Sequence, residues 1–104
     1  MKIRPYPRFE KAYKNRISTN EKLVRRTEER IALFKSNPEN PILKDHGLVG
    51  SKRGLRAFSI TGDIRIVYLP ISENEVIFID IGSQPSLLKD FLNGYPDFPW
   101  KEML

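Results

Sequence analysis

The chain has 104 residues, no cysteine and a formal net charge of +5. This length predicts one domain with one modest core, and the lack of cysteine excludes disulfide bonds and thiolate metal sites. The first residues contain no apolar run typical of a signal peptide, and no segment is as long as a membrane span. We therefore expect a soluble cytoplasmic protein that does not enter a membrane.

The N-terminal half of the chain predicts one short strand followed by two helices. Residues 2–6 suit a strand that Pro5 would confine to a sheet edge, and residues 8–16 suit a short helix. Ser18 and Glu21 have the spacing of a capping box, which predicts a second helix from there to about residue 35. Leu23, Thr27, Ile31 and Phe34 recur at helical spacing and would face the core.

The C-terminal half predicts a three-stranded meander. Residues 40–54 are rich in Pro and Gly and suit an irregular segment. Strands are expected over residues 55–60, 64–71 and 75–81, joined by connections of hairpin length. Residues 85–92 suit a short helix, and residues 93–104 suit a tail that packs on the domain or is partly ordered. The order predicts an α+β domain over residues 1–92, with helices on one face of a small antiparallel sheet.

Charge is distributed unevenly along the chain. Residues 1–60 contain 15 Lys and Arg against 6 Asp and Glu, whereas residues 61–104 contain 3 against 7. Such asymmetry predicts a basic face, which favours binding to phosphate backbones or to an acidic partner peptide. The alternative interpretation is that these cations lie on ordinary solvated helix faces.

Four stretches of the sequence together resemble the RelE/ParE superfamily of type II toxins, most of all its RelE/StbE and YafQ-like branches. They are Pro41-x-Leu43-Lys44-Asp45-His46-x-Leu48-x-Gly50, Gly54-Leu55-Arg56, Asp63-Ile64-Arg65-Ile66-Val67-Tyr68 and Val76-Ile77-Phe78-Ile79-Asp80-Ile81-Gly82-Ser83. The resemblance covers about residues 1–90. It implies a RelE-like fold and, for most members, a ribosome-dependent endoribonuclease that cuts mRNA. The ParE branch instead inhibits DNA gyrase.

RNA cleavage without a metal or cofactor requires proton transfer from the ribose 2′-hydroxyl and to the leaving 5′-oxygen, together with a cation for the phosphorane. His46 is the only histidine, the residue type that titrates near neutrality, and it lies in a polar loop. The alternative is a surface histidine without a role. The resemblance implies a catalytic part for Asp63, although an aspartate in a hairpin turn also has a purely conformational explanation.

Cations of the central segment are the candidates for phosphate binding. Arg65 lies in the middle of an apolar strand, where its guanidinium suits a phosphate clamp; the alternative is an ion pair with Asp80 or Asp63. Lys52, Arg53 and Arg56 are candidates for flanking RNA phosphates, with surface solubility as the alternative.

Two positions depart from the resemblance. Ser59 and Gln84 stand where relatives carry histidine, and neither residue titrates near neutrality. Ser59 is therefore expected to hydrogen bond RNA and Gln84 to orient substrate, which leaves proton transfer to His46 and Asp63. A weak nuclease, one that borrows catalytic groups from the ribosome, and a fold without activity are all compatible with these residues.

Two functional hypotheses follow. In the first, the chain is an mRNA interferase toxin with mRNA and the ribosome as targets. In the second, it is a binding protein of the same fold, directed at gyrase or retained as an inactive partner of an antitoxin. Both imply a cognate antitoxin, whose acidic and apolar segment would fold over the basic surface, and contact with operator DNA only through that complex.

Overall fold

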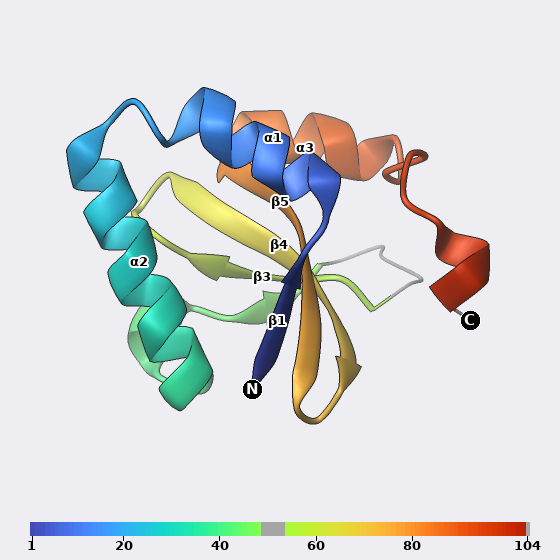
Figure 1. Cartoon of the computed structure of the whole chain (residues 1–104), viewed down its shortest axis with the longest axis horizontal. Coiled ribbons are helices and arrows are strands. Elements are labelled where there is room, and N and C mark those ends of the chain that lie inside the picture. The colour runs from blue at the N-terminus through green and yellow to red at the C-terminus, as the bar shows by residue number, and fades with distance from the viewer. Residues whose placement is uncertain (49–53, 104) are drawn as a thin grey trace.

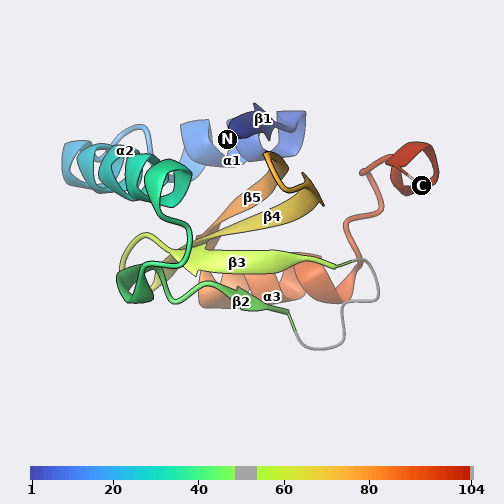
Figure 2. The same cartoon turned by 90° about the horizontal axis from the view of Figure 1, so that it is seen from below.

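The computed structural model describes residues 1–48 and 54–103. Within these ranges a five-stranded sheet, in the order β1-β5-β4-β3-β2, lies between two layers of helix (Figures 1 and 2). The strands are β1 (Lys2–Pro5), β2 (His46–Gly47), β3 (Arg56–Ser59), β4 (Ile64–Ser72) and β5 (Glu75–Ser83). The helices are α1 (Pro7–Arg16), α2 (Glu21–Ser36) and α3 (Gln84–Leu92), with 3₁₀ turns η1 (Pro41–Leu43) and η2 (Trp100–Met103).

The α+β class and the antiparallel meander β3-β4-β5 are confirmed, and the sheet as a whole is mixed. β1 lies at the predicted edge, but it runs parallel to β5, with Lys2 opposite Glu75 and Pro5 opposite Phe78. Residues 6–74 separate these two strands, so no local turn sequence could indicate their relative direction.

Both faces of the sheet carry a core, because the central strands are apolar on both sides. Ile66 and Tyr68 of β4 face α1 and α2, whereas Val67 and Leu69 face α3 and the C-terminal segment. β4 thus buries alternate side chains on opposite faces, and the prediction that the helices lie on one face is wrong for α3. A strand that is apolar on both sides must be covered on both sides.

The helix starts differ in one detail from the sequence prediction. α1 begins at Pro7, where proline lacks only an N–H that has no helical partner. α2 is capped by Asn20, whose side-chain oxygen accepts from the backbone N–H groups of Lys22 and Leu23 at 3.1 and 3.2 Å. The predicted Ser18 capping box is wrong, because the Ser18 hydroxyl donates to Lys14 O at the end of α1. No helix in the described ranges is long and apolar enough to cross a membrane.

The segment before β3 is more regular than predicted. Its described part, residues 40–48, contains η1 and the short strand β2. Lys44 ends η1 in the left-handed region with φ of 49°, and this reversal turns the chain into β2. His46 then pairs with Ala57 and Gly47 with Arg56, so the only histidine is fixed to the outer edge of the sheet.

The C-terminal segment packs on the sheet through aromatic side chains. Tyr95 is fully buried and Phe98 nearly so, in the core shared with Val67 and Ile79. Arg8 of α1 forms ion pairs with Asp97 and with Asp90 of α3, each at 2.9 Å.

Asp80 of β5 is buried beneath this ion-pair network. Its Oδ1 lies 3.3 Å from Arg16 Nη1 and accepts from the backbone N–H of Ile81, and its Oδ2 lies 3.7 Å from Arg8 Nε. Burial raises the pKa of Asp80 to about 6, with a further contribution from Asp90, although Arg16 and the Ile81 N–H act in the opposite direction.

Substitution of Asp80 by asparagine is expected to flatten the pH dependence of stability. A carboxyl whose pKa is raised in the folded state binds its proton more tightly there than in the unfolded chain. Its contribution to the unfolding free energy therefore falls as the pH rises from about 4 to about 6. Denaturant titrations of parent and Asp80→Asn across this interval measure the difference. Equal pH slopes in the two proteins would contradict the assignment.

Candidate active site

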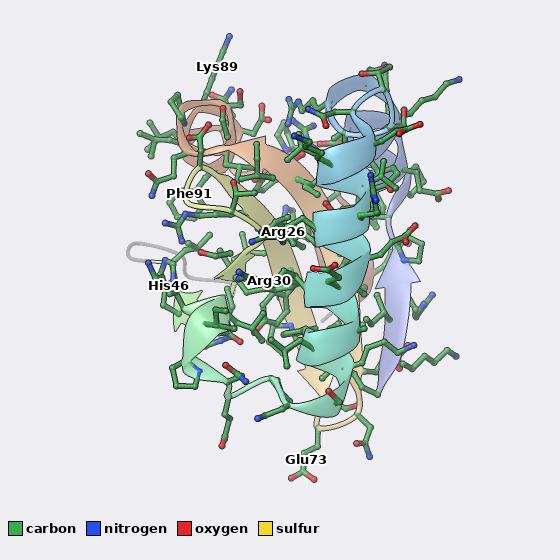
Figure 3. The ribbon with its side chains drawn as sticks, turned by 90° about the vertical axis from the view of Figure 1, so that its left-hand side faces the viewer. Arg26, Arg30, His46, Glu73, Lys89 and Phe91 are labelled. Carbon is green, nitrogen blue, oxygen red and sulfur yellow. The ribbon has the colours of Figure 1, made fainter. Side chains whose placement is uncertain are left out.

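A cavity of about 680 Å³ opens where the β3–β4 turn, the edge strand β2 and the start of α3 meet. The four residues predicted to be catalytic all line it: His46, Asp63, Arg65 and Gln84. They come from β2, the β3–β4 turn, β4 and α3, so the sheet topology brings together positions up to 38 residues apart. Figure 3 shows His46 and Phe91, which also lines the cavity, on the same side of the molecule.

Arg65 is positioned for an anion inside this cavity. On β4 its two cross-strand neighbours are small residues, Ser59 of β3 and Gly82 of β5. Its Nη1 donates to Ser59 Oγ at 3.1 Å, whereas its Nε is buried and has no hydrogen-bond partner. Among the described residues it forms no ion pair, and Asp80, the predicted alternative partner, is engaged by Arg16 and Arg8.

His46 is held in a form that can accept a proton. Its Nδ1 lies 2.9 Å from the backbone oxygen of Lys44. A carbonyl oxygen can only accept, so Nδ1 carries the hydrogen and the neutral ring keeps its lone pair on Nε2. The residue is exposed at the cavity rim, which gives this nitrogen access to a bound molecule.

Asp63 and Gln84 close one end of the cavity. The backbone N–H of Gln84 donates to Asp63 O at 3.2 Å, which joins the β3–β4 turn to the first residue of α3. The turn itself is held by Thr61 Oγ1, which accepts from the backbone N–H groups of Asp63 and Ile64. Both cavity side chains are exposed, and the Asp63 carboxylate forms no ion pair with any described residue.

The residues predicted to bind RNA are not gathered in this cavity. Ser59 is only 4% exposed and holds Arg65, so its side chain supports the site from beneath instead of lining it. Arg56 points to the other side of β3, where its Nε donates to Asp45 Oδ1 at 3.1 Å and Tyr68 donates to Asp45 Oδ2. It lines a separate depression beside η1. Lys52 and Arg53 lie outside the described residues.

An apolar wall of the cavity was not predicted from the sequence. Leu87, Leu88 and Phe91 line it from α3, following Gln84 at spacings of three, four and seven residues. These spacings place side chains on one face of a helix. The same periodicity is visible in the sequence, but it indicates a cavity wall only when Gln84 is known to be the first residue of α3.

The described residues contain no group of three or more His, Cys, Asp or Glu arranged to hold a metal ion. The chemistry available in the cavity is thus that of one imidazole, one carboxylate, one guanidinium and one amide.

Comparison with known proteins gives matches at the level of structure. No family model and no curated protein matches the sequence. The structure is similar to YafQ from E. coli strain BL21(DE3), with a TM-score of 0.69, 24% identity and coverage of 82% of this chain and 94% of that one. A metal-bound toxin from Helicobacter pylori gives a TM-score of 0.67 at 24% identity, covering 84% and 98%.

A YoeB/ParE toxin from Agrobacterium tumefaciens gives a TM-score of 0.64 at 23% identity, covering 81% of this chain and 99% of that one. YafQ is also matched in an E. coli DinJ–YafQ toxin–antitoxin complex, at 22% identity. Likeness at this level of identity establishes the fold. The chain therefore has the fold of the RelE/ParE superfamily of toxins.

Proposed function

We propose that this protein is the toxin of a type II toxin–antitoxin pair and that it cleaves mRNA on the ribosome. The observation that carries the proposal is the cavity that unites His46, Asp63, Arg65 and Gln84, with a buried guanidinium nitrogen of Arg65 left unpaired. A buried donor without a partner is costly in a structure and is commonly retained for function. The toxin fold of the neighbouring structures supports the same conclusion.

The cavity supplies a group for each step of cleavage. His46 Nε2 takes the proton of the ribose 2′-hydroxyl, and the freed oxygen attacks phosphorus. Arg65 stabilises the negative charge of the phosphorane with the Nη donors that its bond to Ser59 leaves free. The bond to the 5′-oxygen then breaks, and that oxygen takes a proton from a water molecule that Asp63 can bind. Gln84 orients the strand, and Ser59 fixes the Arg65 side chain.

A cognate antitoxin is the proposed partner. The wall formed by Leu87, Leu88 and Phe91 offers apolar anchor points beside the cationic floor of the cavity. A segment that combines apolar and acidic side chains and folds on binding would match both. The structure of YafQ with DinJ, a toxin–antitoxin complex, supports this choice.

Induced expression without an antitoxin tests the proposal. Growth is followed while mRNA 5′ ends are mapped, with His46→Ala and Arg65→Ala in parallel. We expect growth arrest with in-frame cuts in translated messages, relieved by either substitution. Arrest with intact messages would favour gyrase as the target. No arrest and no cuts, with the protein folded and present, would favour a partner-binding protein without nuclease activity.

A further inference from the structure

A second depression, which the proposed chemistry does not use, lies between α2 and the β3–β4 turn. It has a volume of about 390 Å³, and its lining includes four cationic residues, Lys22, Arg26, Arg30 and Lys44, and no acidic residue. Figure 3 shows Arg26 and Arg30 extending from α2 toward the side of the molecule on which His46 lies. We call this depression the basic groove.

The charges of the basic groove are largely available to a ligand. Among the described residues, Arg30 Nη1 donates to two backbone oxygens, those of Ile42 at 3.1 Å and Ser59 at 3.4 Å, and Arg30 forms no ion pair, so the guanidinium is oriented without a neutralising carboxylate. Arg26 has one ion pair, with Glu29 at 3.9 Å, in which both side chains are largely exposed. Such a pair contributes little stability and is readily exchanged for another anion. In the described part of the chain, Lys22 and Lys44 form no ion pair.

The basic groove and the cavity of the candidate active site meet at the β3–β4 turn. Thr61 and Gly62 of this turn line the groove, and Asp63, the next residue, lines the cavity. The two sites are also joined through Ser59. Its backbone oxygen accepts from Arg30 in the groove, and its hydroxyl accepts from Arg65 in the cavity.

We propose that the basic groove binds phosphates of the RNA strand adjacent to the scissile phosphate. The strand would pass over the β3–β4 turn, with one phosphate on Arg65 and its neighbours on Arg26, Lys22 and Lys44. This inference rests on the proposed function, because it takes the cavity as the cleavage site. Cations without neighbouring carboxylates match a run of phosphates and contribute affinity without reading sequence. Direct continuity with the cavity favours the substrate strand over an acidic peptide as the occupant.

Binding of a single-stranded RNA with 2′-O-methyl groups throughout tests the proposal, since this RNA lacks the attacking hydroxyl and stays intact. Affinity is measured by fluorescence anisotropy over a range of salt concentrations for the parent, Lys22→Gln and Arg26→Gln. Arg25→Gln is the matched control, because Arg25 is an exposed α2 residue outside the groove lining and its loss changes the net charge equally. Each groove variant is expected to reduce the salt slope by about 0.7, the value for one lost phosphate contact on a single strand.

RNA length separates the groove from the cavity. A trinucleotide reaches only the cavity, so the groove variants should bind it like the parent and lose affinity only for longer strands. An equal loss for Arg25→Gln and Arg26→Gln would overturn the proposal, because attraction would then depend on net charge alone. It would also be overturned if the groove variants bound long RNA normally but bound an antitoxin weakly, which would identify an acidic peptide as the occupant.

This test is independent of cleavage. His46→Ala, which should abolish cleavage, is expected to keep the parental salt slope and length dependence. The parent could prove to have no nuclease activity while the groove variants still show a reduced salt slope. That result would support RNA binding by the basic groove and contradict the proposed cleavage reaction. If the parent cleaves RNA and the groove variants keep the parental salt slope, the cleavage reaction is supported and RNA binding by the basic groove is contradicted.

Discussion

Arg65→Met is expected to lower the rate of RNA cleavage by about 100-fold or more while leaving the protein at least as stable as the parent. The activity is lost because the guanidinium is the cation of the cavity, and removal of one such donor costs about 10²–10³ in rate. Stability is retained because the buried Nε of Arg65 has no partner, and an unsatisfied buried donor costs about 1–3 kcal/mol. Methionine keeps the apolar stem and removes that donor, at the loss of one bond to Ser59 Oγ.

Single-turnover cleavage of a ribosome-bound message and the midpoint of denaturant unfolding measure the two effects. Arg65→Lys, which keeps the charge but not the planar fork, is expected to have an intermediate rate. Arg4→Met is the matched control, because Arg4 is an exposed arginine of edge strand β1 outside the cavity. A fully active Arg65→Met, or one that fails to fold, would show that Arg65 has a structural role.

His46→Ala is expected to lower the cleavage rate by about 10²–10⁴, the usual contribution of a positioned proton-transfer group. The effect on the free energy of unfolding should stay within about 0.5 kcal/mol, because the side chain is exposed and, within the described ranges, its hydrogen bond is with the Lys44 carbonyl. The readouts are the same cleavage assay and denaturant titration.

His46→Asn separates positioning from proton transfer. Asparagine can still donate a hydrogen bond toward Lys44 O, but it cannot take up a proton near neutrality. It should therefore be as slow as alanine. Parental activity in His46→Asn would show that the ring only orders the loop, and that another group accepts the 2′-hydroxyl proton.

Local patterns in the sequence account for most of the fold. The apolar stripe of α2 predicted its buried face, because the stripe depends only on the residue period of one element. The errors arose where an element depends on another segment, either the neighbouring helix or a distant strand. Asn20 caps α2 because the Ser18 hydroxyl is used by the preceding helix. The parallel pairing of β1 depends on contacts with β5 that no local window contains.

The candidate site likewise has features that the local sequence predicts and features that depend on tertiary contacts. The sequence predicted that Arg65 lies within an apolar strand, and the fold adds that Ser59 orients its guanidinium. Strand alternation puts Arg56 on the face of Tyr68, where Asp45 binds it, and its part in binding flanking phosphates stays a prediction. The link from Arg30 to Ser59 and the apolar wall at Phe91 require tertiary structure, since they join elements that are distant in sequence.

The most direct test of the account is translation in a purified system with the purified protein added and message 5′ ends mapped by primer extension. Parallel reactions omit ribosomes or contain Arg65→Met. We expect cuts at positions in register with the reading frame that require both translating ribosomes and Arg65. An intact message in the presence of excess folded protein, or cuts that persist in Arg65→Met, would contradict the assignment of this cavity as an RNA-cleaving site.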